Sequence, residues 1–236
     1  TFYAPFCIPF ILGASVMFLT LAWKWGKWLW LLPRADKKRI LFGLPTRRTL
    51  AAAWEVVSES LLHRRIFRVN PLLGYMHMSL AFGWFLLIAV GWIETIAYLG
   101  FRYVPLQGHV FFKYFGTGLE HKPAFDFVMD LLLLFVLSGV ALAWGKRVYS
   151  RAMGLRRTTK HVLGDRVALS ALWFVFPARL VAESATCALY GGGGFLTGGL
   201  GAWIAAHIGM MPLMNLETAA WWFYSSCLGV FFVALP

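Results

Sequence analysis

The chain has 236 residues, of which 60% are hydrophobic and only 14% are charged. Soluble domains carry about one charged residue in four, so this composition excludes a monomeric water-soluble fold and predicts an all-α integral membrane protein. The formal net charge of +12 does not indicate nucleic-acid binding, because the basic residues gather in loops between apolar stretches, where they would face anionic lipid.

Five stretches are apolar enough to cross a bilayer, which takes about 20 residues of helix. They predict transmembrane helices at about 5–32, 69–98, 124–145, 166–190 and 218–236, forming one five-helix membrane domain. The first stretch lacks a basic leading segment and a small-residue cleavage site, so we interpret it as a true span and not a signal peptide.

Basic residues are distributed unequally between the two sides of this bundle. Nine Lys and Arg residues lie between Pro33 and Pro71 and seven between Lys146 and Arg166, against three on the other side, Arg102, Lys113 and Lys122. Loops rich in Lys and Arg stay in the cytoplasm. We therefore expect the N-terminus outside and the C-terminus in the cytoplasm.

Two further segments have helical character without crossing. Residues 49–62 carry an apolar face and predict an interfacial helix on the cytoplasmic side, or a docking surface for a soluble partner. Residues 195–214 are uncharged but broken by glycines before Ala202 and ended by Pro212, so we expect a short helix, about Ala202–Met211, lying in or dipping into the outer face.

Cysteines and tryptophans receive no functional role from the sequence. Cys7, Cys187 and Cys227 are widely spaced without a CxxC motif, so they are expected to be small buried hydrophobes, and no iron–sulfur cluster is expected in this chain. Tryptophans such as Trp28, Trp92 and Trp221 are expected in interfacial belts.

His77 is the most informative polar residue within a predicted span. It lies about two turns from the cytoplasmic end of the second span, with Gly74 and Ala81 at i−3 and i+4. Small neighbours would let a porphyrin edge approach the backbone, and a neutral imidazole can ligate iron. The alternative is a histidine that forms an interhelical hydrogen bond.

Arg179 and Glu183 stand at i and i+4 in the fourth span and can neutralise each other. The functional alternative gives Arg179 a haem propionate or a quinone carbonyl and gives Glu183 a role in proton transfer.

A third polar group lies toward the outer side. Glu94 ends the second span, Asp126 and Asp130 begin the third, and His109 and His121 lie between them. These residues are candidates for proton exchange with a quinone, or for a second metal site at one of the histidines, although such groups often lie simply among lipid headgroups. His63 and His161, in the basic loops, are expected to be solvated.

The segment from Glu59 to Trp84, including the run NPLLGYMHMSLAFGW, resembles the membrane domain of bacterial iron–sulfur oxidoreductases related to heterodisulfide reductase. That domain is similar in topology to the cytochrome b subunit of respiratory nitrate reductase. The resemblance extends over nearly the whole chain, most specifically residues 59–84 and 218–236. It implies five spans, haem b between the second and fifth spans, and electron exchange with membrane quinone.

By this resemblance His77 matches the second-span haem ligand nearest the cytoplasm. The resemblance places the partner histidine and a cytoplasmic iron–sulfur domain just after a segment like FFVALP, so both are expected downstream of Pro236. One haem b is expected, with its second ligand outside this chain.

The sequence thus predicts a respiratory electron-transfer subunit of the bacterial inner membrane. It would be the quinone-reactive part of an oxidoreductase within a larger complex, exchanging electrons between menaquinone or ubiquinone and a cytoplasmic iron–sulfur protein or domain through haem b. The alternative is a haem-free membrane anchor or assembly subunit.

Overall fold

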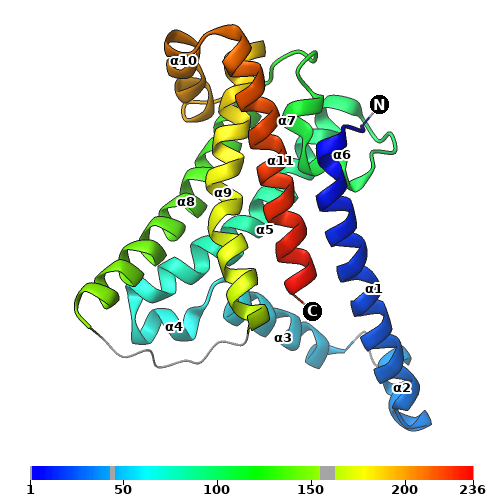
Figure 1. Ribbon diagram of the computed structural model, residues 1–236. Coiled ribbons are helices and arrows are strands. Elements are labelled where there is room, and N and C mark those ends of the chain that lie inside the picture. Colours follow the sequence, from blue (N-terminus) through cyan, green and yellow to red (C-terminus); the bar gives the residue numbers. More distant parts are fainter. Residues whose placement is uncertain (1, 43–45, 155–162, 236) are drawn as a thin grey trace.

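A computed structural model describes residues 2–42, 46–154 and 163–235. His161 and Pro236 lie outside these residues. Every regular element in the described part of the chain is helical (Figure 1). The expected all-α class is therefore confirmed.

Four helices of the described residues are long and apolar enough to cross a membrane. They are Pro5–Leu31, made of η1 (Pro5–Cys7) and α1 (Ile8–Leu31), α5 (Pro71–Leu99), α8 (Pro123–Ala152) and α9 (Leu163–Tyr190). They coincide with the first four predicted spans, although α8 continues to Ala152 beyond its expected end at residue 145. A multi-pass membrane protein is the class that these helices define.

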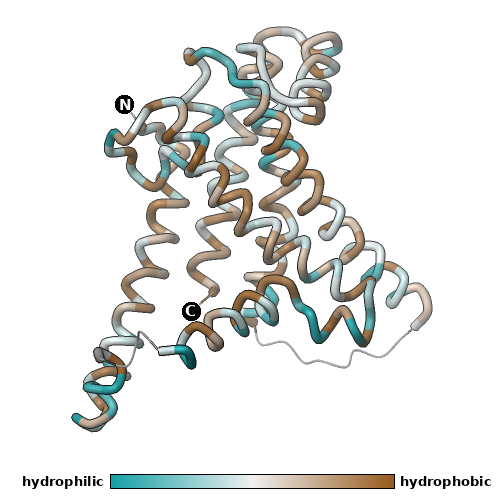
Figure 2. The backbone as a smooth tube through the Cα atoms, turned by 180° about the vertical axis from the view of Figure 1, so that it is seen from behind, coloured by the Kyte–Doolittle hydropathy of each residue, from teal (hydrophilic) through white to brown (hydrophobic). Residues whose placement is uncertain are grey.

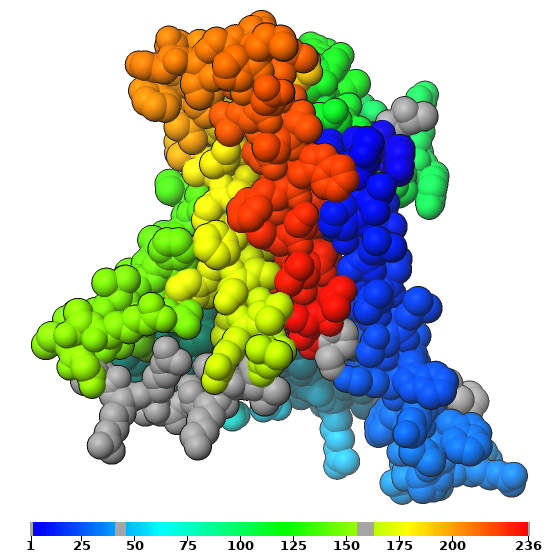
Figure 3. Space-filling model, in the orientation of Figure 1, coloured from blue at the N-terminus to red at the C-terminus, as the bar shows by residue number. Residues whose placement is uncertain are grey.

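The last long helix, α11, runs from Met210 to Ala234 and is not among those four. It lies between α9 and α1 (Figure 3) and packs against both. The expected start at residue 218 is wrong, and so is Pro212 as the end of the preceding helix. Pro212 lies in the first turn of α11, where a helix needs no backbone N–H donor.

The short helix α10 spans Thr197–His207, eleven residues, and is too short to cross. The sequence predicted its existence and length class but not its start, because glycines 198, 199 and 201 were expected to prevent a helix. Gly201 is needed there: a Cβ atom on it would lie 2.8 Å from the carbonyl oxygen of Ser184 in α9. Tight packing against α9 thus outweighs the low helix propensity of glycine.

Close approaches between the long helices also occur at glycine. A Cβ atom on Gly13 of α1 would lie 2.4 Å from the Gly229 oxygen of α11, and one on Gly229 would lie 2.3 Å from the Pro9 oxygen. In the α5–α8 pair, a Cβ atom on Gly139 would lie 1.9 Å from the Ser79 hydroxyl oxygen. Small residues let membrane helices pack backbone to backbone.

The remaining helices divide between the two ends of the bundle (Figure 1). At the end with the C-terminus lie the basic helices α2 (Arg34–Phe42), α3 (Arg47–Glu55) and α4 (Arg64–Val69), with η2 (Val56–Leu61) between α3 and α4 in the chain. At the end with the N-terminus lie α6 (Leu106–Val110), α7 (Phe112–Phe115) and α10. Figure 2 shows hydrophobic colouring through the middle of the bundle, with hydrophilic segments at both ends, α2 and α4 among them. The helix predicted at 49–62 is present as α3 and η2, and its Leu50 and Trp54 are 73% and 63% exposed.

An aromatic cluster fills the core near the N-terminal end, where Phe6, Phe111, Tyr114 and Tyr224 surround Trp221. Trp221 is fully buried, and its indole N–H donates to the Thr186 hydroxyl at 2.9 Å. The expectation that Trp221 belongs to an interfacial belt is therefore wrong. The expectation for the cysteines is confirmed, since all three are free and buried.

Candidate functional site

Acidic side chains, which are usually exposed to solvent, are buried at one end of the bundle. Five are buried within α5, α8, α9 and α11: Glu94, Asp126, Asp130, Glu183 and Glu217. Charged groups at membrane depth are costly unless they are paired or face a cavity. Glu94, Asp126 and Asp130 are 7%, 6% and 2% exposed, so the protein itself shields these side chains from solvent and lipid.

Arg179 and Glu183 form the predicted ion pair along α9, with Arg179 Nε donating to Glu183 Oε1 at 2.8 Å. Their side chains are 13% and 9% exposed, so the pair faces the bundle interior. Arg179 also faces the hydroxyl of Tyr224 on α11. The guanidinium keeps further N–H donors beyond the one that Glu183 uses.

A second ion pair joins α7 to α8, where the Lys113 ammonium donates to Asp126. Burial alone would lower the pKa of Lys113, but the hydrogen bond and negative charge of Asp126 outweigh it, so the pKa lies above its usual value. On the other side of this carboxylate, His121 Nδ1 lies 3.9 Å from Asp126 Oδ2, and the His121 side chain is 48% exposed. Asp126 thus connects a buried lysine to an exposed histidine.

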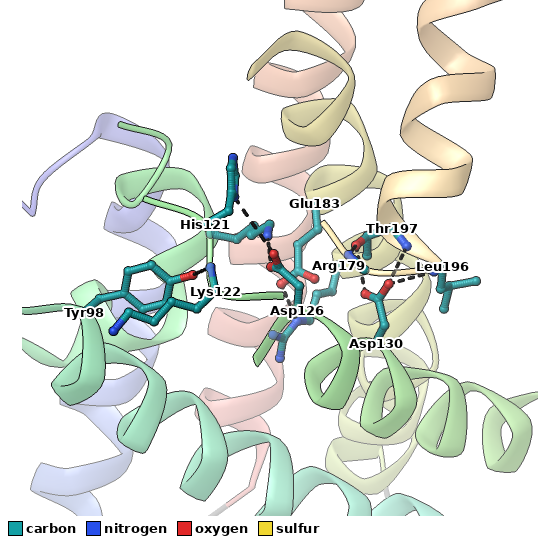
Figure 4. A network of polar contacts seen from close by, with 11 residues as sticks. Tyr98, His121, Lys122, Asp126, Asp130, Arg179, Glu183, Leu196 and Thr197 are labelled. Atoms are coloured by element: carbon teal, nitrogen blue, oxygen red, sulfur yellow. Dashed lines mark hydrogen bonds and ion pairs between the residues drawn. The ribbon is translucent and has the colours of Figure 1, made fainter. Parts of the chain in front are cut away.

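Asp130 has a visible structural task (Figure 4). Its Oδ2 accepts the backbone N–H groups of Leu196 and Thr197 at 2.7 and 2.9 Å, and its Oδ1 accepts the Thr197 hydroxyl at 2.8 Å. These donors belong to the N-terminus of α10, whose positive end favours a carboxylate. Asp130 therefore anchors α10 to α8.

Glu94 differs from the other buried acids. It forms no hydrogen bond and no ion pair within 4.0 Å with any residue that the structure describes, yet only 7% of it is exposed. Its nearest charges act at longer range, from Glu183, Lys113, Arg179 and Asp126. A buried carboxyl without a direct partner is expected to face water or a ligand.

His109 on α6 is half-buried and its ring stacks on that of Trp92, with centroids 4.0 Å apart and planes 11° apart. Its Nδ1 atom is buried without a hydrogen-bond partner among the described residues. Burial lowers the pKa of His109 despite an opposing hydrogen bond to the Val104 backbone. A neutral imidazole can exchange a hydrogen bond or a proton with a bound molecule.

His109 and Arg179 lie in the wall of an apolar cavity of about 450 Å³. The rest of the wall is almost entirely hydrophobic and comes from α1, α5, α6, α8 and α11, including Phe10, Ala81, Trp84, Phe85, Leu87, Met129, Leu228, Phe231 and Phe232. An apolar cavity with a few convergent polar groups is the usual form of a small-molecule site. It can hold a flat hydrophobic ring whose polar atoms meet His109 and Arg179.

Two smaller cavities with polar side chains in their walls, each of about 20 Å³, lie toward the N-terminal end. The first shares His109 and Arg179 with the apolar cavity and also contacts Glu94, Lys113, Asp126 and Glu183. The second shares Glu94 and Lys113 with the first and contacts His121. Each has room for about one water molecule.

His77 lies at the opposite end of α5. It is half-buried, and its ring stacks on that of His63, with centroids 5.4 Å apart and planes 13° apart. His63 is the only non-glycine residue with positive φ in the described chain, and its Nδ1 lies 3.2 Å from the Leu61 oxygen. The expectation that His63 is simply solvated is therefore wrong.

The space beside His77 differs in part from the prediction. A Cβ atom on Gly74 would lie 2.6 Å from the Phe67 ring, so α4 fills the space that the sequence assigned to a porphyrin edge. Ala81, one turn further on, does line the apolar cavity. The residues present thus fit one imidazole ligand beside an apolar wall.

The structure does not bring the two predicted cofactor residues together. Arg179 lies beside Glu94, and Glu94 is seventeen residues beyond His77 on α5, which is about 25 Å along a helix. Arg179 therefore cannot hold a propionate of a haem that His77 ligates. It belongs with His109, Glu94, Glu183 and Asp126, while His77 belongs with His63.

Sequence reasoning missed Lys113, Tyr224 and His63. Lys113 was visible only as a loop charge, and Tyr224 as one aromatic residue among many. His63 stood in a run of basic residues, and only tertiary packing places it against His77. Within the described residues no three His, Cys, Asp or Glu side chains gather as they would around a metal ion, and the second metal site considered at His109 or His121 stays a prediction.

Comparison of the chain with models of protein families, with curated proteins and with solved structures finds no match.

Proposed function

We propose that this chain is a membrane electron-transfer subunit that exchanges electrons between quinone and a cytoplasmic iron–sulfur protein or domain through haem b. It would cross the bacterial inner membrane five times, with α11 as the fifth span, the N-terminus outside and the C-terminus in the cytoplasm. The apolar cavity with His109 and Arg179 at one end carries the proposal.

Quinone chemistry accounts for the composition of the cavity wall. A quinone ring and its isoprenoid tail are apolar, so they would be stabilised by the aromatic and aliphatic residues of α5 and α11. Its carbonyl oxygens accept hydrogen bonds, which Arg179 and a protonated nitrogen of His109 can donate. Menaquinone and ubiquinone share these features.

His77 would hold the haem iron from α5, together with a second protein ligand, as the family resemblance implies. Bound there, haem b would supply one-electron chemistry that the side chains lack. Ala81, one turn from His77, lines the same cavity as His109 and Arg179, so this cavity extends from near His77 to the polar end. The basic elements α2 to α4 surround the His77 end, where an acidic cytoplasmic partner would dock.

A visible spectrum of the full-length protein in its native complex tests the proposal. Replacing His77 by Ala is expected to abolish the reduced haem b absorbance while leaving the bundle inserted, because insertion depends on the apolar spans. His207→Ala is the matched control, because His207 is exposed at the other end of the molecule and interacts only with Trp203 among the described residues. A haem spectrum that survives in the His77→Ala protein would overturn the ligand assignment.

A second candidate function is a haem-free membrane anchor. The stacking of His77 on His63 favours it, because that contact gives the His77 ring a packing role of its own. The exposed apolar face of α3, with Leu50 and Trp54, would then dock a soluble subunit. Absence of any haem absorbance from the native complex would select this function.

A further inference from the structure

We propose that protons of the quinone site are exchanged with the N-terminal face of the protein, through Glu94, the Lys113–Asp126 pair and His121. The inference rests on the proposed function, since it assigns the path of the protons that quinone chemistry requires. Oxidation of one quinol breaks two O–H bonds, sends two electrons one at a time to haem b, and leaves two protons that must depart. Reduction of quinone takes up two protons by the same path.

The path begins where the apolar cavity meets the first polar cavity. His109 and Arg179 line both, and the buried Nδ1 of His109 has no partner among the described residues. Arg179 is permanently charged and cannot take up a proton. His109, through its unpartnered Nδ1, is thus the group at this junction able to accept a proton from a quinol hydroxyl.

Glu94 lies at the next junction. It lines both polar cavities, and only 7% of its surface is exposed. It has no direct partner in the described chain. Two of the other acids at the first cavity, Glu183 and Asp126, form ion pairs with Arg179 and Lys113 respectively. Glu94 is therefore the carboxyl free to accept and release a proton, and a cavity of about 20 Å³ on either side of it has room for a relaying water.

The exit lies at Asp126 and His121. Lys113 lines the second cavity and pairs with Asp126 Oδ1. His121 Nδ1 lies 3.9 Å from the other carboxylate oxygen, Asp126 Oδ2. The backbone N–H of Lys122 donates to the Tyr98 hydroxyl at 2.8 Å, which holds this loop against α5 (Figure 4). His121 is half-exposed, so it passes the proton to solvent on the N-terminal face.

Within the described residues, the part of the large cavity wall that α5 contributes offers no such route to the other end. From Glu94 toward His77, the side chains of α5 that line the large cavity are Ala81, Trp84, Phe85, Leu87, Ile88, Gly91 and Trp92, none of which carries an ionisable group. Electrons and protons would therefore leave the quinone toward opposite faces.

The test uses the full-length protein with its haem in liposomes that contain a trapped pH dye, driven by a short-chain quinol. Glu94→Gln keeps the shape and removes the titrating group. We expect an unchanged dithionite-reduced haem spectrum and a rate of haem reduction by quinol lowered about tenfold or more. Glu217→Gln is the matched control: this buried acid is bound by Thr186, lines none of the three cavities, and should leave the rate unchanged.

A second variant tests the exit. His121→Ala, at an exposed position, should slow proton release to the N-terminal face and recover with added imidazole, which a purely structural role would not allow. Rapid quinol-driven haem reduction in Glu94→Gln, or protons appearing on the face of α2–α4, would overturn the route while leaving the proposed function standing. Failure of quinol to reduce the wild-type haem would instead overturn the proposed function.

Discussion

Arg179 lines both the apolar cavity and the first polar cavity of the candidate site. It closes the polar end of the apolar cavity, and its charge is balanced within α9 by Glu183. Placing an arginine at this depth is tolerable because its partner is one helical turn away. The pair therefore fixes a positive charge where a quinone oxygen would lie, without leaving a net charge in the bundle.

Breaking this pair on one side should destabilise the protein more than removing both charges. In Glu183→Gln the guanidinium stays buried without its counter-charge, which costs about 3–5 kcal/mol. The double variant Arg179→Gln, Glu183→Gln should lose less. Unfolding of the purified protein in detergent measures both.

The control for this comparison is the exposed pair between Arg65 and Glu55, whose side chains are 75% and 66% exposed. Arg65→Ala should change the unfolding free energy by no more than about 1 kcal/mol. Equal stability of the single and double Arg179–Glu183 variants would show that the two charges are not coupled.

At the scale of elements, glycines lie where pairs of long helices approach each other most closely. α1 meets α11 at Gly13 and Gly229, and α5 meets α8 at Gly139. Both contacts bring a backbone atom or a short side chain to within the space that a methyl group would occupy. These crossings hold the walls of the apolar cavity, since α1, α5 and α11 all contribute to it.

Gly229→Ala should destabilise the bundle by about 1–3 kcal/mol, because its new Cβ would lie 2.3 Å from the Pro9 oxygen and force α1 away from α11. Gly26→Ala is the comparison within α1, where a Cβ meets nothing within 4 Å. That change should leave stability the same or raise it by up to about 1 kcal/mol. If thermal unfolding in detergent shows equal effects, the crossing is not a tight contact.

α5 and α10 differ in how much of each helix could be predicted from the sequence. α5 was predictable because an apolar run, a leading Asn-Pro and the length of a bilayer coincide in it. α10 was misplaced because its start depends on Asp130 binding Leu196 and Thr197 and on Gly201 packing against α9. Neither contact leaves a local pattern in the sequence.

The candidate site shows the same division. The Arg179–Glu183 pair follows from i, i+4 spacing within one helix, so it was predictable. The pairing of Lys113 with Asp126 and the stacking of His63 on His77 join different elements, and spacing cannot reveal them. The separation of His77 from Arg179 is likewise a property of how α9 lies along α5.

For the whole molecule, the distribution of charge is the dominant feature. The basic elements α2, α3 and α4 occupy one end, and the buried acids lie toward the other. This arrangement agrees with the positive-inside rule if the end with α2–α4 is cytoplasmic.

Labelling of intact cells with a membrane-impermeant thiol reagent should reveal this orientation. Cysteine at Phe101, which is 96% exposed, should be labelled from outside, whereas cysteine at Ile40 should not. The three native cysteines are buried, so the background should be low. Labelling of Ile40→Cys from outside would reverse the topology.

The packing of α1 on α11 has a consequence for biogenesis. The backbone N–H of Phe10 donates to the Ser225 hydroxyl, a residue 215 positions later in the chain. α1 is therefore synthesised long before α11, and it stays in lipid without this partner while the residues between them are synthesised. The sequence from Thr1 to Trp23 carries no charge, so α1 is stable in lipid during that interval. The cavity can close only once α11 is in place, because α11 follows the other helices that line it in the chain.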